Sequence, residues 1–274
     1  MPVTGRPDSG RIFTLKLGLS SLHLIGQPFQ ILLASIASSK VKNWEIVDDI
    51  AHRLNEGRAR RLQKLKKKLG LRYTVHAPFE DLNIASLNPK TRKIAVDELS
   101  RSIRFAARID AEVWVVHPGL HSGLSWAYPG RQWKLNLEAL AHLKEKAEDL
   151  GLCIAIENMP RGRFVLGSSQ DFLTFFAEGP MLGTKMTLDV GHANTHNEID
   201  EFFAKLGGRI CHMHIHDNHG RSDEHNTIGR GTTDWVAVTR FVRNEKFSGF
   251  LIVESTSGTM ESYKKACEML CPYR

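Results

Sequence analysis

Eight short β-rich runs recur along the chain, and stretches with helical spacing of apolar residues separate them. Several runs are continuously apolar, which is typical of parallel strands that are covered on both faces. Helical patterns fill the intervals, for example over residues 91–109 and 133–150. The runs are FTLKLGLS, NWEIVD, RYTVHA, EVWVVHPG, CIAIENM, KMTLDVGH, ICHMHIHD and FLIVEST. Eight βα units in about 250 residues predict an α/β fold, a (β/α)8 barrel.

The composition agrees with one large barrel. The chain has 274 residues, of which 42% are hydrophobic and 24% are charged, so a full core is available. We expect residues 1–12 to form a flexible N-terminal tail and residues 13–274 to form a single barrel domain. No apolar run reaches the length of a membrane span. The sequence therefore predicts a cytoplasmic protein with no membrane partner, and it leaves the oligomeric state open.

The chain is basic, with a formal net charge of +7 and an isoelectric point near 9.3. This balance suits a polyanionic partner such as nucleic acid, but a solvated cationic surface is the commoner cause. Residues 58–70, RARRLQKLKKKLG, supply much of the excess charge. Their leucines recur at helical spacing, which predicts an amphipathic helix with a basic outer face. Such a face is more often solvated than bound to DNA.

Imidazoles and carboxylates stand at the ends of six consecutive predicted strands. In a (β/α)8 barrel these ends meet at one rim, where the active sites of such enzymes lie. Ionisable groups are costly to gather without a metal or another partner. Imidazole and carboxylate ligands without thiolates suit Zn, Mn or Fe(II). The strand-end residues are His76, His117, Glu157, Asp189, His214 and Glu254, and His192, Asp223 and His225 follow nearby.

Residues 211–231, CHMHIHDNHGRSDEHNTIGRG, contain five of the 13 histidines. His212 lies two positions before His214, so both side chains face the barrel interior, with His212 in a deeper layer. His216 continues that face and is a candidate contact for substrate or metal. Asp217 is expected to support the turn or to hold a ligand imidazole. Arg230 is a candidate anion contact.

The motifs YTVHAPF, VVHPG, IEN, LDVGHAN, HIHD, DEHNTIGRG and IVES resemble the xylose isomerase-like TIM barrel superfamily. The resemblance covers roughly residues 14–270, and the superfamily includes endonuclease IV and many sugar isomerases and epimerases. The endonuclease IV branch implies nine ligands around three zinc ions. All nine have counterparts here: His76, His117, Glu157, Asp189, His192, His214, Asp223, His225 and Glu254.

The isomerase and epimerase branch implies a simpler site. Its four ligands match Glu157, Asp189, His214 and Glu254, around one Mn or similar ion. Glu157 and Glu254 would then move a proton on a carbon atom next to a carbonyl group. The substrate would be a small sugar or a sugar phosphate.

Charge and ligand number favour the endonuclease branch as the leading interpretation from sequence. Three divalent ions would turn the −4 of the four carboxylates into +2, which suits a phosphodiester, whereas one ion would leave −2. We therefore expect hydrolysis at abasic sites in DNA with up to three zinc ions, or Mn or Fe in their place, and Glu157 and Glu254 as catalytic residues. The sugar isomerase or epimerase is the alternative.

Candidate substrate contacts lie on the predicted rim loops and do not decide between the branches. The acidic residues Glu80 and Asp81 would repel DNA phosphates. The epimerase branch has a substrate-binding carboxylate at the position of Arg163. Aromatic side chains on these loops could stack on a sugar or a base. The candidates are Phe79, Trp126, Arg163, His216 and Arg230.

Overall fold

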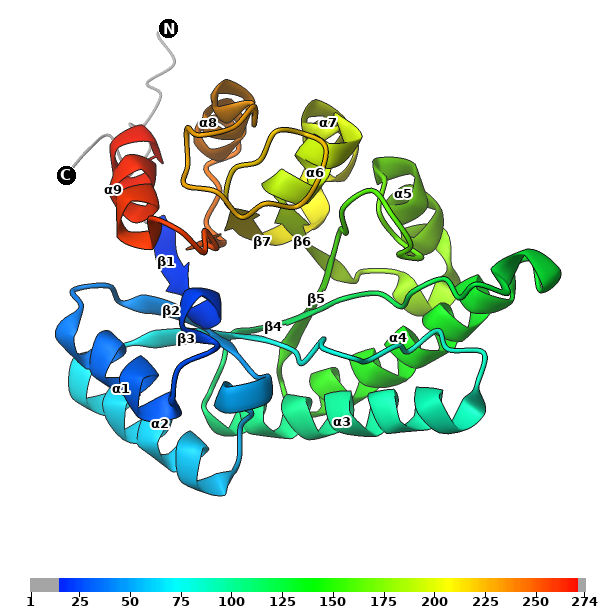
Figure 1. The fold of residues 1–274 in the computed structure, drawn as a ribbon, viewed down its shortest axis with the longest axis horizontal. Helices are drawn as coiled ribbons and strands as arrows, with labels where there is room; N and C mark the ends of the chain where they lie inside the picture. Colours follow the sequence, from blue (N-terminus) through cyan, green and yellow to red (C-terminus); the bar gives the residue numbers. More distant parts are fainter. Residues whose placement is uncertain (1–14, 271–274) are drawn as a thin grey trace, which may run out of the picture.

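A computed structural model of the chain describes residues 15–270, and eight parallel strands in them close into a barrel in sequence order. Helices surround the strands (Figure 1). The strand runs read from the sequence all form strands, so the predicted (β/α)8 barrel is confirmed. The strands are β1 (Lys16–Ser20), β2 (Asn43–Val47), β3 (Arg72–His76), β4 (Val113–Val116), β5 (Cys153–Glu157), β6 (Lys185–Asp189), β7 (Ile210–Ile215) and β8 (Phe250–Val253).

The helices connect the strands on the outside of the barrel. The two long predicted helices are α3 and α4, each within two residues of its expected bounds, and the predicted basic helix is α2. Side-chain caps such as Asn55 and Asn88 begin α2 and α3. The helices are α1 (Phe29–Ser38), α2 (Glu56–Leu69), α3 (Pro89–Arg108), α4 (Arg131–Asp149), α5 (Ser169–Ala177), α6 (Val190–His196), α7 (Ile199–Leu206), α8 (Trp235–Asn244) and α9 (Thr259–Leu270).

Apolar side chains fill the barrel at the end where the strands begin. A small interior cluster comprises Val113, Val115, Ala155, Phe250 and Ile252, and a larger cluster packs between the strands and the helices. Burial of these apolar side chains is the main favourable contribution to folding. Because the interior cluster occupies the N-terminal end of the strands, the C-terminal end is left for polar side chains.

The segment between β7 and α8 folds as an ordered loop. Asp217 accepts hydrogen bonds from Gly229 N at 2.7 Å, Thr233 N at 3.1 Å and Trp235 Nε1 at 3.0 Å. The carboxylate of Asp217 therefore stabilises the loop, which is the first of the two roles expected for it. These hydrogen bonds do not go to a ligand imidazole, which was the second. Asp234 caps the start of α8 through Val236 N and Ala237 N.

Two sequence predictions concern the chain ends and membranes. The predicted N-terminal tail, residues 1–12, lies outside the described residues. Within residues 15–270, no helix has both the length and the apolar character needed to cross a bilayer.

Candidate metal centre

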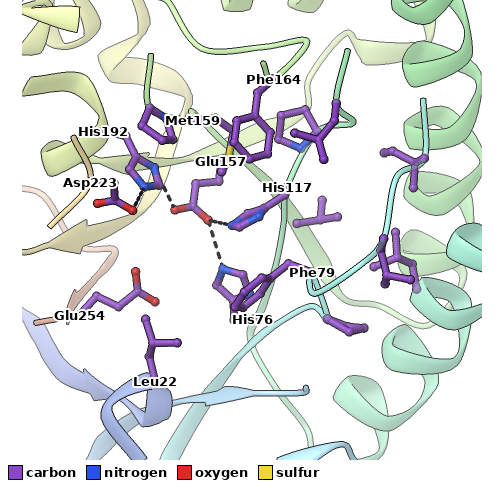
Figure 2. A pocket seen from close by; sticks show the side chains of 18 of the residues that line it. Leu22, His76, Phe79, His117, Glu157, Met159, Phe164, His192, Asp223 and Glu254 are labelled. Carbon is purple, nitrogen blue, oxygen red and sulfur yellow. Dashed lines mark hydrogen bonds and ion pairs between the residues drawn. The ribbon is translucent and has the colours of Figure 1, made fainter. Parts of the chain in front are cut away.

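The C-terminal ends of the strands bring the predicted ligands together. His76, Glu157 and Asp189 are the last residues of β3, β5 and β6, and His214 is the next to last residue of β7. His117 and Glu254 directly follow β4 and β8. All except His117 are buried, and Figure 2 shows several of them converging from different strands.

One set of four side chains, which we call the four-ligand group, comprises Glu157, Asp189, His214 and Glu254. Each offers one ligand atom, and these atoms all lie within 4.8 Å of one another. His214 Nδ1 lies 2.8 Å from Glu157 Oε1, 3.5 Å from Glu254 Oε2 and 3.7 Å from Asp189 Oδ2. Three carboxylates and one imidazole around a common point form a donor set that suits a divalent cation.

Glu157 also belongs to a second set, in which it contacts His76 and His117, which we call the imidazole pair. Its Oε2 atom lies 3.3 Å from Nε2 of His76 and 3.3 Å from Nε2 of His117. The two oxygens of Glu157 therefore face different groups, Oε1 toward His214 and Oε2 toward the imidazole pair (Figure 2 shows the second). This geometry would allow Glu157 to bridge two ions.

A third set, which we call the loop group, comprises His192 on α6 and Asp223 and His225 in the loop after β7. Asp223 Oδ2 lies 3.1 Å from His192 Nε2 and 2.9 Å from His225 Nε2. His216 also faces this group, because its Nε2 lies 3.6 Å from Asp223 Oδ1, but it is closer to Asp189, at 3.1 Å from both carboxylate oxygens. The ring of His216 occupies the space over Gly191, where an added Cβ would come within 2.1 Å of it.

Backbone carbonyls orient three of the ligand imidazoles. Nδ1 of His76 lies 2.8 Å from Ala77 O, Nδ1 of His192 lies 2.8 Å from Asn158 O, and Nδ1 of His225 lies 2.9 Å from Glu254 O. A carbonyl oxygen can only accept, so Nδ1 carries the proton in each ring. The Nε2 atoms are thereby directed at the carboxylates, which is the arrangement common around metal-ligating histidines.

In the metal-free protein, nearby carboxylates raise the pKa values of several site histidines, so these histidines carry protons at positions where a cation could bind. Burial lowers the pKa of His76, but the hydrogen bond and charge of Glu157 outweigh it and raise the pKa to about 9. The charges of Asp189 and Asp223 likewise outweigh burial and raise the pKa of His192 to about 10. At His117 burial prevails and lowers the pKa.

The two glutamates respond in opposite directions. Burial would raise the pKa of Glu157, but the charges of His214 and His117 hold it well below its ordinary value. Burial raises the pKa of Glu254 above its ordinary value, despite the opposing charges of His214 and His225. Two carboxylates with pKa values shifted apart can serve as a base and an acid.

Glu45 is a buried member of the site that the sequence interpretation missed. It lies on β2, is fully buried, and places Oε1 2.8 Å from Nε2 of His214 and Oε2 3.0 Å from Nε2 of His212. Thr74 donates a hydrogen bond to Glu45 Oε2 at 3.1 Å. His212 lies in the deeper, buried position expected for it, whereas His219 is exposed and contacts Glu224 at 2.7 Å.

A cavity of about 280 Å³ opens beside the ligands. His76, His117, Glu157, His192, Asp223, His225 and Glu254 contribute to its lining, and apolar side chains such as Leu22, Phe79 and Phe164 form most of the remainder (Figure 2). The ring of Phe79 lies 5.2 Å from that of His76 and 5.3 Å from that of His117. Asp49 holds the loop of Phe79 by accepting from the backbone N–H groups of Phe79 and Glu80, both at 2.9 Å.

The structure does not bring the other predicted substrate contacts to this cavity. Trp126 is 79% exposed on a short 3-10 helix, and Arg163 and Arg230 are exposed. None of these three lines the cavity. Phe164, the next residue after Arg163, lines the cavity, and its ring lies 6.2 Å from that of His117.

Residues 33–273 match the sequence family described as the xylose isomerase-like TIM barrel. The chain belongs to this family. It is 35% identical to an uncharacterized protein of Methanocaldococcus jannaschii, MJ1311, across 89% of this chain and 85% of that protein. The crystal structure of a D-tagatose 3-epimerase-like protein matches with a TM-score of 0.82 and 32% identity, across 94% of this chain and 99% of that one.

More distant relatives of the chain carry two kinds of name. A fructoselysine 3-epimerase of Shigella flexneri is 26% identical across 60% of this chain and 59% of its own length. A probable endonuclease 4 of Shouchella clausii is 27% identical across 63% of each chain. Sequence identity alone does not separate the two activities. The crystal structure of a D-psicose 3-epimerase shares the fold, with a TM-score of 0.76 and 15% identity across 93% of this chain and 99% of that one.

Proposed function

We propose that the protein is a metal-dependent isomerase or epimerase that acts on a small, uncharged ketose. The observation that carries this proposal is the shape and lining of the cavity. Glu157 and Glu254 both line a cavity of about 280 Å³ whose other walls are mostly apolar. This volume lies just below the usual range for ligand cavities, about 300–1,000 Å³, and suits a small ligand such as a monosaccharide.

The lining favours a neutral substrate over a phosphate ester. Among the described residues that line the cavity there is no lysine or arginine to bind a phosphate group. Phe79 and Phe164 offer apolar ring faces against which the C–H face of a sugar can pack. Glu80 and Asp81 are exposed beside Phe79, where they would repel a nucleic-acid backbone. These features reverse the order of the two interpretations drawn from sequence.

The roles of the residues follow from their positions. One carboxylate, in its ionised form, would take a proton from the carbon next to the ketose carbonyl, and the other, in its protonated form, would return a proton to that carbon or its neighbour. In the metal-free protein the pKa of Glu157 is lowered and that of Glu254 is raised, so the proposal gives Glu157 the first role and Glu254 the second. A divalent ion in the four-ligand group would polarise the carbonyl and stabilise the negative charge that develops.

The second candidate is phosphodiester hydrolysis at abasic sites in DNA with up to three zinc ions. The loop group of His192, Asp223 and His225 supports it, because a single-ion site has no need of these ligands. The probable endonuclease 4 relative supports it as well. The exposed cations of α2, such as Arg60 and Lys64, give no added support, because they face solvent on the outside of the barrel.

A paired assay tests both candidates. The protein is stripped of metal, reconstituted with Mn or Zn, and incubated with a panel of ketoses and ketose phosphates, and in parallel with a duplex that carries one abasic site. The proposal predicts conversion of a free ketose, loss of that activity in Glu254→Gln, and no incision of the duplex. Incision 5′ to the lesion without any ketose conversion would reject the proposal in favour of the second candidate.

A further inference from the structure

The ring of His214 differs from those of His76, His192 and His225 in the group that holds the nitrogen facing away from the ligand set. Backbone carbonyls hold Nδ1 of His76, His192 and His225, so these rings face the carboxylates through Nε2. His214 is turned the other way, with Nδ1 toward Glu157 at 2.8 Å and Nε2 toward Glu45 at 2.8 Å. A side chain from a different strand thus takes the place of the carbonyl.

We propose that Glu45 is a positioning residue that keeps the proton of His214 on Nε2 and presents Nδ1 to the four-ligand group. A carboxylate accepts hydrogen bonds and cannot donate them when ionised. The nitrogen that faces Glu45 at 2.8 Å therefore carries a proton. Nδ1 faces Glu157 at 2.8 Å and also carries a proton in the metal-free protein, but a cation in the four-ligand group would displace that proton and leave the Nε2 proton in its hydrogen bond to Glu45.

The surroundings fix Glu45 in turn. Its carboxylate is fully buried, receives a hydrogen bond from Thr74 on the neighbouring strand β3, and contacts His212 at 3.0 Å. Glu45 and Thr74 are directly paired in the register of β2 and β3. The position of the carboxylate is thus set by the barrel itself and not by a mobile loop. Partners of this kind hold the ring and raise the basicity of the ligating nitrogen.

The inference holds for either proposed chemistry, and its test does not use enzymatic activity. Zinc affinity is measured by competition with a chelator in the Asp223→Asn background, which weakens the loop group. Glu45→Leu removes the acceptor, Glu45→Gln keeps an oxygen acceptor without the charge, and Glu138→Gln, an exposed change on α4, is the matched control. We expect Glu45→Leu to weaken zinc binding by about 10- to 100-fold, with a smaller loss in Glu45→Gln and little change in Glu138→Gln.

The position of the proton is read directly by ¹H–¹⁵N NMR of the histidine rings in zinc-loaded protein. Signals of His214 are assigned by their absence in His214→Gln. The proposal predicts a protonated Nε2 in the wild type and in Glu45→Gln, and a measurement on these two proteins remains decisive if Glu45→Leu does not fold. A proton on Nδ1 of the wild type, or unchanged zinc affinity in a folded Glu45→Leu protein, would overturn it.

Discussion

His225 Nε2 lies 2.9 Å from Asp223 Oδ2, and the two residues are two positions apart in the loop that follows β7. The same carboxylate oxygen lies 3.1 Å from His192 Nε2 on α6. In a tetrahedral zinc site with bonds of about 2.0–2.1 Å, ligand atoms lie about 3.3 Å apart. This spacing is close to that of a tetrahedral site and supports the proposal that the loop group could hold an ion of its own, apart from the four-ligand group.

Removing the acidic member of the loop group separates the two candidate functions. In Asp223→Asn we expect the metal content to fall by about one ion per chain, because the group loses its only carboxylate. Ketose conversion should persist, since the four-ligand group is intact. Metal content is measured by elemental analysis after dialysis, beside the ketose assay. Loss of all ketose conversion in a folded variant with an intact four-ligand group would contradict the proposed function.

Glu157 is the residue whose replacement should have the largest effect on turnover. Its two oxygens contact different groups, with His214 on one side and the imidazole pair of His76 and His117 on the other. In Glu157→Gln we expect kcat for the ketose to fall by about 10²- to 10⁴-fold, the range for loss of an acid or base. Glu138→Gln, an exposed change on α4, is the matched control. A Glu157→Gln enzyme with more than a tenth of the wild-type kcat would contradict the role.

Phe79 should contribute to substrate binding more than to turnover. It forms a wall of the cavity beside His76 and His117 but holds no ionisable group. Loss of ring packing worth about 0.5–1.5 kcal/mol predicts a rise in KM of up to about tenfold in Phe79→Ala. Trp126→Ala removes an aromatic ring that is 79% exposed and outside the cavity, so its KM should not change. Equal effects of the two substitutions would show that the cavity is not the binding site.

The metal-free protein should lose stability as the pH rises from 7 to 10. His192, with a pKa of about 10, and His76 and His225, with pKa values of about 9, hold protons in the folded state more tightly than the ordinary value of 6.5 implies. Their contribution is fully present below pH 6.5 and is lost as the pH passes through 9 to 10. The check is the thermal midpoint of chelator-treated protein from pH 6 to 10, compared with His192→Gln.

Comparison with His192→Gln separates the titration of His192 from that of the other residues. The difference in thermal midpoint between the wild type and His192→Gln should become smaller toward pH 10. A gap that widens with pH would show that His192 does not carry the raised pKa. Zinc affinity should change in the opposite sense and rise over the same range, because zinc must displace these protons.

The barrel and the nine proposed ligands could be read from the sequence because both follow from local patterns. An apolar run predicts a strand, and a histidine or carboxylate at its end, such as His76 or Glu157, is placed at the common rim by the topology alone. The ligands then needed no knowledge of side-chain packing. The structure brings all nine into three adjoining groups.

Glu45 could not be found in this way. It stands in the middle of β2 between the buried residues Trp44 and Ile46, not at a strand end, and it is 169 positions from His214. The two meet because the barrel closes and turns both side chains inward. A lone carboxylate inside a buried strand was the available signal, since such a group requires a partner.

The cavity wall was also beyond the sequence, because it depends on the path of loops. Trp126 and Arg163 lie in the expected segments but point to solvent, while Phe164 lines the cavity. Contacts between loops decide whether a loop side chain faces the cavity or solvent. One such contact is the hydrogen bond from His121 N to Arg163 O at 2.6 Å. No periodic pattern encodes such a contact.

The central claim, proton transfer on a ketose in this cavity, is tested most directly by exchange with solvent. Metal-reconstituted protein is incubated with the ketose panel in deuterated water, and deuterium at the carbons flanking the carbonyl is followed by NMR. We expect deuterium incorporation into at least one free ketose and none in Glu157→Gln. Glu254→Gln should convert no ketose to its isomer or epimer, although Glu157 can still exchange the proton that it takes. Fully metallated wild-type protein that exchanges no proton of any ketose, yet cleaves an abasic duplex, would contradict it.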